Sequence, residues 1–200
     1  MSLGELYIFP PLIWSRNTHW SNYLQAMTVV DFPIFFKNTM TILIPVLAGT
    51  LLVGSMCAYA FARLKFPLRG FWFALVLSNL MLPYAVVMLP RFILWSRLGA
   101  VNTFYPLIIP AWFGTGIGGA FMIFLLRQFF LTIPKDFEDA AIIDGAGYFM
   151  IYWRIMLPLV KPALIVVSLF TFMFVWNDDF LCYFSMFFNL FGSKEGNRIL

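Results

Sequence analysis

Long uncharged runs, each bounded by charged residues, dominate the hydrophobic pattern of the chain. A hydrocarbon core of about 30 Å requires roughly 20 apolar residues in a helix. Four runs reach that length and predict membrane spans near Thr39–Ala62, Gly70–Pro90, Tyr105–Leu126 and Leu157–Asn177. The last run reaches full length because Lys161 can extend its amine toward the interface. The pattern predicts an all-α integral membrane protein, a four-span helical bundle.

The segments outside these runs have a different pattern. Met1–Phe36 mixes aromatic and polar residues, lacks the features of a signal peptide and predicts an external or interfacial segment. Phe180–Ser193 is apolar but only 14 residues long, which is too short to span and better suits an interfacial or buried segment. The chain therefore divides into an external segment (1–36), a transmembrane core (37–178) and a C-terminal tail (179–200).

Composition supports the membrane interpretation and excludes several other classes. Hydrophobic residues make up 62% of the chain and charged residues 11%, whereas an average soluble domain carries about 25% charged residues. His19 is the only histidine, and Cys57 and Cys182 form no CxxC pair. No histidine cluster or redox motif is therefore present. The net charge of +4 does not indicate nucleic acid, since the basic residues flank apolar runs.

The distribution of lysine and arginine predicts the orientation. The loops 63–69 and 127–161 carry seven basic residues on one face, against four on the other. The positive-inside rule places the seven in the cytoplasm.

Glycine and proline interrupt the predicted spans. Pro45, Pro83 and Pro110 lie in or at the edges of spans, and Gly114 and Gly118 fit a GxxxG pattern. Two interpretations stay open: close packing between helices, or a bent and mobile helix that lines a pathway.

The loop 127–156, between the third and fourth predicted spans, predicts a pair of short helices. Pro134 suits a first turn, and acids follow it where the helix dipole favours negative charge. Gly145 suits a left-handed stop, after which a second helix runs from about Tyr148 to Met156 and ends at Pro158. Anionic headgroups repel such an acidic helix, so a protein partner is favoured over a lipid surface.

The same loop carries a recognisable motif. Asp139-Ala-Ala, three residues, Gly145, nine residues and Ile155-x-Leu157-Pro158 resembles the EAA loop of ABC importer permeases. The segments 58–67, 124–130 and 176–178 resemble the maltose-type carbohydrate permeases. Asp139 stands where that family has glutamate, which keeps the charge but shortens the reach, so weaker docking is expected.

The resemblance implies a binding-protein-dependent ABC importer in a bacterial or archaeal inner membrane, crossed several times by the chain. Its partners would be a second permease, a cytoplasmic ABC ATPase dimer, an external solute-binding protein and the lipid bilayer, with no nucleic acid. ATP and Mg would be bound by the ATPase, so this chain would need no cofactor and would not be an enzyme; it has no GxxxxGK[ST] loop. The implied ATPase-coupling residues are Glu138, Asp139, Ala140, Ala141, Asp144, Gly145, Ile155, Leu157 and Pro158.

Departures from the family pattern leave three interpretations. The family has six spans, and the first and last are missing from the four predicted here. After Asp178 the residues no longer resemble the family. A shifted reading frame or a truncated gene product would explain this change. The chain is then a sugar-importer permease working by alternating access, or a non-transporting remnant that keeps the ATPase-docking loop. An unrelated membrane enzyme or channel is the third interpretation, although the spans carry almost no polar groups. The residues do not identify the solute; the resemblance implies a sugar or sugar derivative, with polyols and glycerol phosphate diesters as related alternatives.

Overall fold

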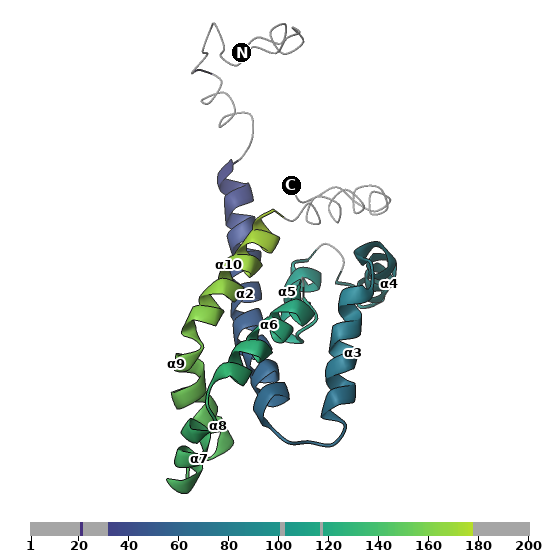
Figure 1. The fold of residues 1–200 in the computed structure, drawn as a ribbon. Coiled ribbons are helices and arrows are strands. Elements are labelled where there is room, and N and C mark those ends of the chain that lie inside the picture. Colours follow the sequence, from purple (N-terminus) through teal and green to yellow (C-terminus); the bar gives the residue numbers. More distant parts are fainter. Residues whose placement is uncertain (1–20, 22–31, 101–102, 117, 178–200) are drawn as a thin grey trace, which may run out of the picture. The chain divides into compact units, whose positions relative to one another are not determined.

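All regular structure in the described part of the chain is helical. The computed structural model describes residue 21 and residues 32–100, 103–116 and 118–177. Its helices are α2 (Phe32–Arg63), α3 (Arg69–Met81), α4 (Tyr84–Arg97), α5 (Tyr105–Trp112), α6 (Gly119–Thr132), α7 (Asp136–Ile143), α8 (Tyr148–Ile151), the π-helical turn η2 (Tyr152–Met156), α9 (Leu157–Leu159) and α10 (Lys161–Trp176) (Figure 1). The predicted C-terminal tail and most of the predicted external segment lie outside the described residues.

Two compact units divide the chain, Met1–Asn38 and Thr39–Leu200. The described part of the first unit is Ser21 and the start of α2. Every contact discussed below lies within the second unit.

The first predicted span is a continuous helix. α2 contains all of Thr39–Ala62 and passes through Pro45 without a break. Among the described residues it is the one helix that is long and apolar enough to cross a membrane by itself. Two further crossings are obtained if each of two sharply bent helix pairs is counted as one span.

The second and third predicted spans are broken rather than straight. α3 ends at Met81, and Leu82 takes an extended conformation because the following proline disfavours the helical one. Pro83 cannot donate a backbone hydrogen bond, and α4 starts after it in a new direction. In the third, Gly114 and Gly118 both have φ of 68°. These glycines form the turn between α5 and α6, so the GxxxG pattern is not a helix-packing face.

The fourth predicted span begins later than the sequence indicated. The helix Tyr148–Leu159 meets Lys161–Trp176 at an angle of 77°. Pro158 does not end the first of these helices, which continues to Leu159. A proline ring clashes with the carbonyl four residues before it, and the wider π-helical turn η2 lies at that place. Pro162 then opens α10, where its missing N–H costs nothing.

The core lies where α2, α6 and the helices after α7 meet. Met122, Leu126 and Phe130 of α6 are fully buried against Ala58 of α2 and Met156 of η2. Gly49 allows α2 to approach α5 closely, since a Cβ there would lie 2.9 Å from the Trp112 ring. Large apolar side chains on α3 and α10 remain exposed, including Trp72, Leu169 and Phe172. Such faces suit lipid or another subunit.

Candidate coupling site

Helix α7 ends where its sequence predicts, but it begins at Asp136 with Lys135 as its N-cap, so Pro134 precedes the helix and does not lie in its first turn. Asp136, Glu138 and Asp139 occupy the first turn. At the other end Gly145 has φ of 80°, and its N–H donates to the Ile142 carbonyl at 3.0 Å. The Ala146 N–H donates to the Ala141 carbonyl at 2.9 Å. These two bonds form a Schellman motif, which requires a left-handed residue where Gly145 stands.

The predicted coupling residues point in two directions. Asp139, Ala140, Asp144, Gly145 and Pro158 are exposed. Ala141 is 6% exposed and belongs to the core, and Ile155 and Leu157 pack against the same core. Ala141 therefore differs from Ala140, because its methyl group faces the chain's own helices. The exposed residues of α7 form its outward surface: Asp136, Phe137, Asp139, Ala140, Ile142 and Ile143.

Glu138 points inward and meets Arg63, the last residue of α2. Arg63 Nη1 lies 3.7 Å from Glu138 Oε2, and the two side chains are 4% and 15% exposed. The same guanidinium binds the end of α6: Nε and Nη2 donate to the Phe130 carbonyl at 3.0 and 2.6 Å, and Nη2 also donates to the Ile133 carbonyl. The last carbonyls of a helix have no partner within the helix, and a cation there also complements the dipole.

Arg127 makes the reverse connection between the same two helices. Its Nε donates to the Phe61 carbonyl near the end of α2 at 3.2 Å. Its guanidinium carbon lies 4.2 Å from the ring centroid of Phe73 in α3, a favourable cation–π position. α2 and α6 are thus fastened to one another by two arginines, each binding a carbonyl near the end of the other helix.

A buried pair of hydroxyl groups joins α2 to η2, in the segment that follows α7. Ser55 Oγ of α2 and Tyr152 Oη of η2 lie 2.7 Å apart. The Tyr59 ring packs against Phe130 and Tyr152, with centroid distances of 5.7 and 5.4 Å. Figure 1 shows α7 and α8 near the C-terminal end of α2. The outward face of α7 is therefore supported from behind by a set of buried side chains, which we call the mount: Ser55, Tyr59, Arg63, Phe130 and Tyr152.

The environment of Glu138 changes its acidity. Burial raises the pKa of this carboxyl above its ordinary value, although the nearby Arg63 guanidinium lowers it. The Tyr59 hydroxyl also lies close enough to affect the Glu138 pKa, but not in hydrogen-bond geometry. Within the described ranges, Tyr59 Oη and Glu138 Oε1 are buried without a hydrogen-bond partner.

The raised pKa predicts a pH-dependent difference between the wild-type chain and Glu138→Gln. The folded state binds this proton more tightly than the unfolded state does. The stabilisation from Glu138 is therefore complete below pH 4.5, its ordinary pKa, and is lost as the pH rises through the raised value. Thermal unfolding in detergent should show wild type losing stability relative to Glu138→Gln as the pH rises above 4.5.

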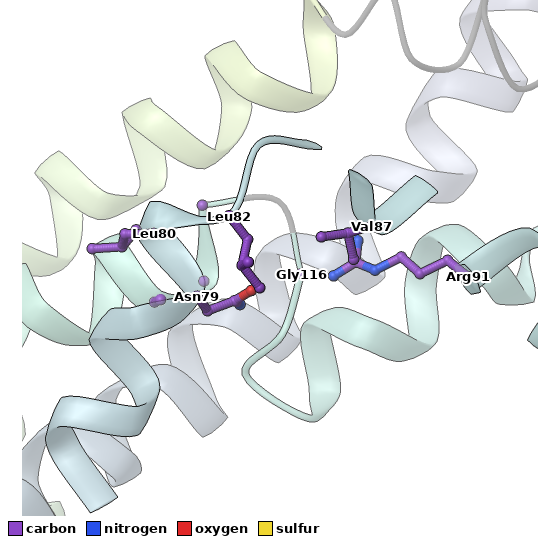
Figure 2. Close-up of a pocket in the computed structure, with 9 residues that line it drawn as sticks. Asn79, Leu80, Leu82, Val87, Arg91 and Gly116 are labelled. Atoms are coloured by element: carbon purple, nitrogen blue, oxygen red, sulfur yellow. The ribbon is translucent and has the colours of Figure 1, made fainter. Parts of the chain in front are cut away.

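A separate cavity of about 130 Å³ lies beside the glycine turn. Figure 2 shows Asn79 and Leu82 on one side of it and Arg91 on the other. The remaining lining residues are Leu80, Val87, Gly116, Gly118, Gly119 and Ala120. Arg91 Nη2 donates to the Thr115 carbonyl at 2.9 Å, so this arginine ties α4 to the turn that precedes α6.

Sequence comparison decides the family. The family described as binding-protein-dependent transport system inner membrane component matches residues 50–193. The chain belongs to this family. The match includes the residues that hold α7 and extends past Asp178, beyond the segments that carry the resemblance. This chain is 39% identical over 164 residues to a probable ABC transporter permease protein of Pyrococcus horikoshii, covering 80% of this chain and 58% of the relative.

Other relatives are permeases of sugar uptake systems. This chain is 32% identical over 182 residues to the diacetylchitobiose uptake system permease protein NgcG of Streptomyces coelicolor, covering 90% of this chain and 58% of that one. It is 39% identical over 179 residues to the arabinooligosaccharides transport system permease protein AraQ of Halalkalibacterium halodurans, covering 89% and 61%. The chain thus spans about three fifths of these relatives' lengths.

A solved structure has the same fold. It is a bacterial ABC transporter involved in the import of the acidic polysaccharide alginate. The TM-score is 0.62 at 27% sequence identity, over 71% of this chain and 48% of that chain.

Sequence reasoning missed Arg63 and Arg127 as site residues and used them only as topology charges. The signal was present, because Arg63 lies within the 58–67 segment that carried part of the resemblance. A charged residue directly after a long apolar run can turn back onto its own helix end or onto a neighbouring one.

Proposed function

We propose that this chain is a membrane-spanning permease component of an ATP-driven importer for a sugar or a related solute. In this proposal the outward face of α7 docks on a cytoplasmic ABC ATPase, which binds ATP and Mg. A second permease covers exposed apolar faces of the spans, and an external binding protein delivers the solute. ATP-driven movement of α7 then shifts the spans between inward-open and outward-open states.

The observation that carries this proposal is the construction of α7. It is a short acidic helix with an exposed outer face, ended by Gly145 and held from behind by Arg63 and Ala141. An isolated helix of this length is unstable in water, so the mount is what keeps it formed. Its motif spacing is that of the EAA loop. Two relatives belong to uptake systems for diacetylchitobiose and arabinooligosaccharides, which favours a sugar as the solute.

Reversing the charge of Asp139 is expected to weaken ATPase binding. Asp139 is exposed on the outward face and makes no ion pair within the described residues. Asp139→Lys should raise the Kd for the purified cognate ATPase roughly 10- to 100-fold, because truncated or reversed charges at an interface centre cost about 2 kcal/mol or more. The measurement is binding of the ATPase to the detergent-solubilised complex, at fixed salt.

Asp136→Lys is the matched control, since this exposed acid on the same helix lies outside the motif. It should change the Kd less than about three-fold, as expected for a charge at the rim. Equal effects of the two variants, or no ATPase binding by wild type, would contradict the docking assignment. ATPase binding without uptake of solute into vesicles would favour a subunit that docks but does not transport.

A further inference from the structure

The proposed function leaves open how movement of α7 reaches the spans. We infer that Arg63 is the positioning residue that makes α7 and α2 move as one body, through its ion pair with Glu138. This inference rests on the proposed function, because an ATPase must act on α7 for the connection to matter. It assigns a role to two side chains that face away from the docking surface.

Few groups connect α7 to the rest of the fold. Ala141 is its one buried residue, and a methyl group contacts neighbours without fixing a direction. Glu138 is the residue of α7 that forms an ion pair in the described part of the chain. An ion pair in a water-poor site is electrostatically stronger than it would be in water. Apart from the chain connections to α6 and α8, force on the outward face of α7 therefore reaches the neighbouring helices mainly through Glu138.

Arg63 connects Glu138 to two further helices. One guanidinium binds Glu138, the Phe130 carbonyl and the Ile133 carbonyl. Its own backbone is the last residue of α2, the longest described helix. Three elements therefore share one planar group, whose five donors have a fixed geometry. A displacement of α7 cannot leave α2 behind without breaking these contacts.

Arg127 provides a comparison within the same fold. It also joins α2 to α6, through the Phe61 carbonyl, and it contacts Phe73. Among the described residues, Arg127 makes no hydrogen bond, ion pair or ring contact with α7. Loss of either arginine should therefore loosen the helix ends, but only loss of Arg63 should separate α7 from α2.

The adjacent acids Glu138 and Asp139 have different roles, one in the connection to α2 and the other in ATPase docking. Asp139 is exposed and Glu138 is largely buried. Loss of Asp139 should weaken ATPase binding, whereas loss of Glu138 should break only the connection to Arg63. Buried Ala141 and the Gly145 turn then keep α7 formed and able to bind the ATPase.

The test is an intramolecular distance measured in the full chain with its ATPase. Spin labels are placed at Ile143→Cys on α7 and Ile44→Cys on α2, which are 86% and 64% exposed, in a background with Cys57→Ala and Cys182→Ala. Double electron–electron resonance spectroscopy then gives the distance between the two labels, first without nucleotide and then with Mg-ATP plus vanadate. In wild type we expect one narrow distance that is the same in both states.

Arg63→Met and Glu138→Ala should broaden the distance distribution at least about two-fold and make it change with nucleotide, since the two helices no longer form one body. Arg127→Met should keep the wild-type distribution. ATPase binding by Glu138→Ala should stay within about three-fold of wild type, because its docking face is unchanged. If Arg63→Met fails to fold, the label distance in Glu138→Ala decides the test.

Three results would overturn the inference: a wild-type distance that changes with nucleotide, Glu138→Ala behaving like wild type, or Arg127→Met behaving like Glu138→Ala. Absence of ATPase binding by wild type would be a different failure, that of the proposed function. The binding measurement and the distance measurement therefore separate the two.

Discussion

Replacing Arg63 with methionine is expected to lower the free energy of unfolding by about 3–5 kcal/mol, the usual cost of removing one partner from a buried ion pair. The Arg63 side chain is 4% exposed. Its loss removes the donors to the Phe130 and Ile133 carbonyls and leaves Glu138 buried without its countercharge. Chemical unfolding in mixed micelles, followed by circular dichroism, measures the change.

Arg97→Met is the matched control for this variant. Arg97 also lies in the last turn of a helix, α4, but it is exposed. Its replacement should change the free energy of unfolding by no more than about 0.5 kcal/mol, as is usual for surface positions. If both arginine variants lose the same stability, the buried mount described here does not hold the helix ends together.

Replacing Gly119 with alanine is expected to disrupt the turn between α5 and α6. A Cβ at this position would lie 2.5 Å from the Gly114 carbonyl oxygen and 3.0 Å from its carbon. These are backbone atoms, so no flexible side chain can move aside. The cost should reach about 1–3 kcal/mol or more, the range for overpacking a filled site. The loss of thermal stability in detergent measures it.

Gly70→Ala is the corresponding control, because a Cβ there meets no atom within 4 Å. Alanine is the better helix former by about 1 kcal/mol, so this change in α3 should be neutral or slightly stabilising. Equal losses for Gly119→Ala and Gly70→Ala would show that helix propensity, rather than the close approach to Gly114, determines the effect.

The sequence predicted the helical class and the local form of α7 because those depend on short-range rules. The acids in the first turn and Gly145 after the last are read directly from residue types. The breaks at Pro83 and at the glycine turn were harder, since apolar periodicity counts residues and does not show direction. Gly114 and Gly118 fit a packing motif equally well, and only their positive φ angles show a turn.

The inward half of the site could not be predicted from spacing alone. Glu138 and Asp139 are adjacent acids of similar propensity, and their different roles follow from which of them meets Arg63. That contact joins residues 75 positions apart in the chain. Ala141 likewise shares its motif with exposed Ala140, yet it packs into the core, because the helix is mounted on that side.

The central claim is that the outward face of α7 contacts an ABC ATPase, and site-specific photo-cross-linking tests it most directly. A photoreactive residue is placed at Ala140, exposed on α7, and in a second chain at Leu169, exposed on α10. After irradiation of intact membranes, mass spectrometry identifies the joined peptides. The account predicts an ATPase carrying a GxxxxGK[ST] loop at position 140 and not at position 169. A folded chain that gives no ATPase cross-link from position 140, or the same cross-link from both positions, would contradict it.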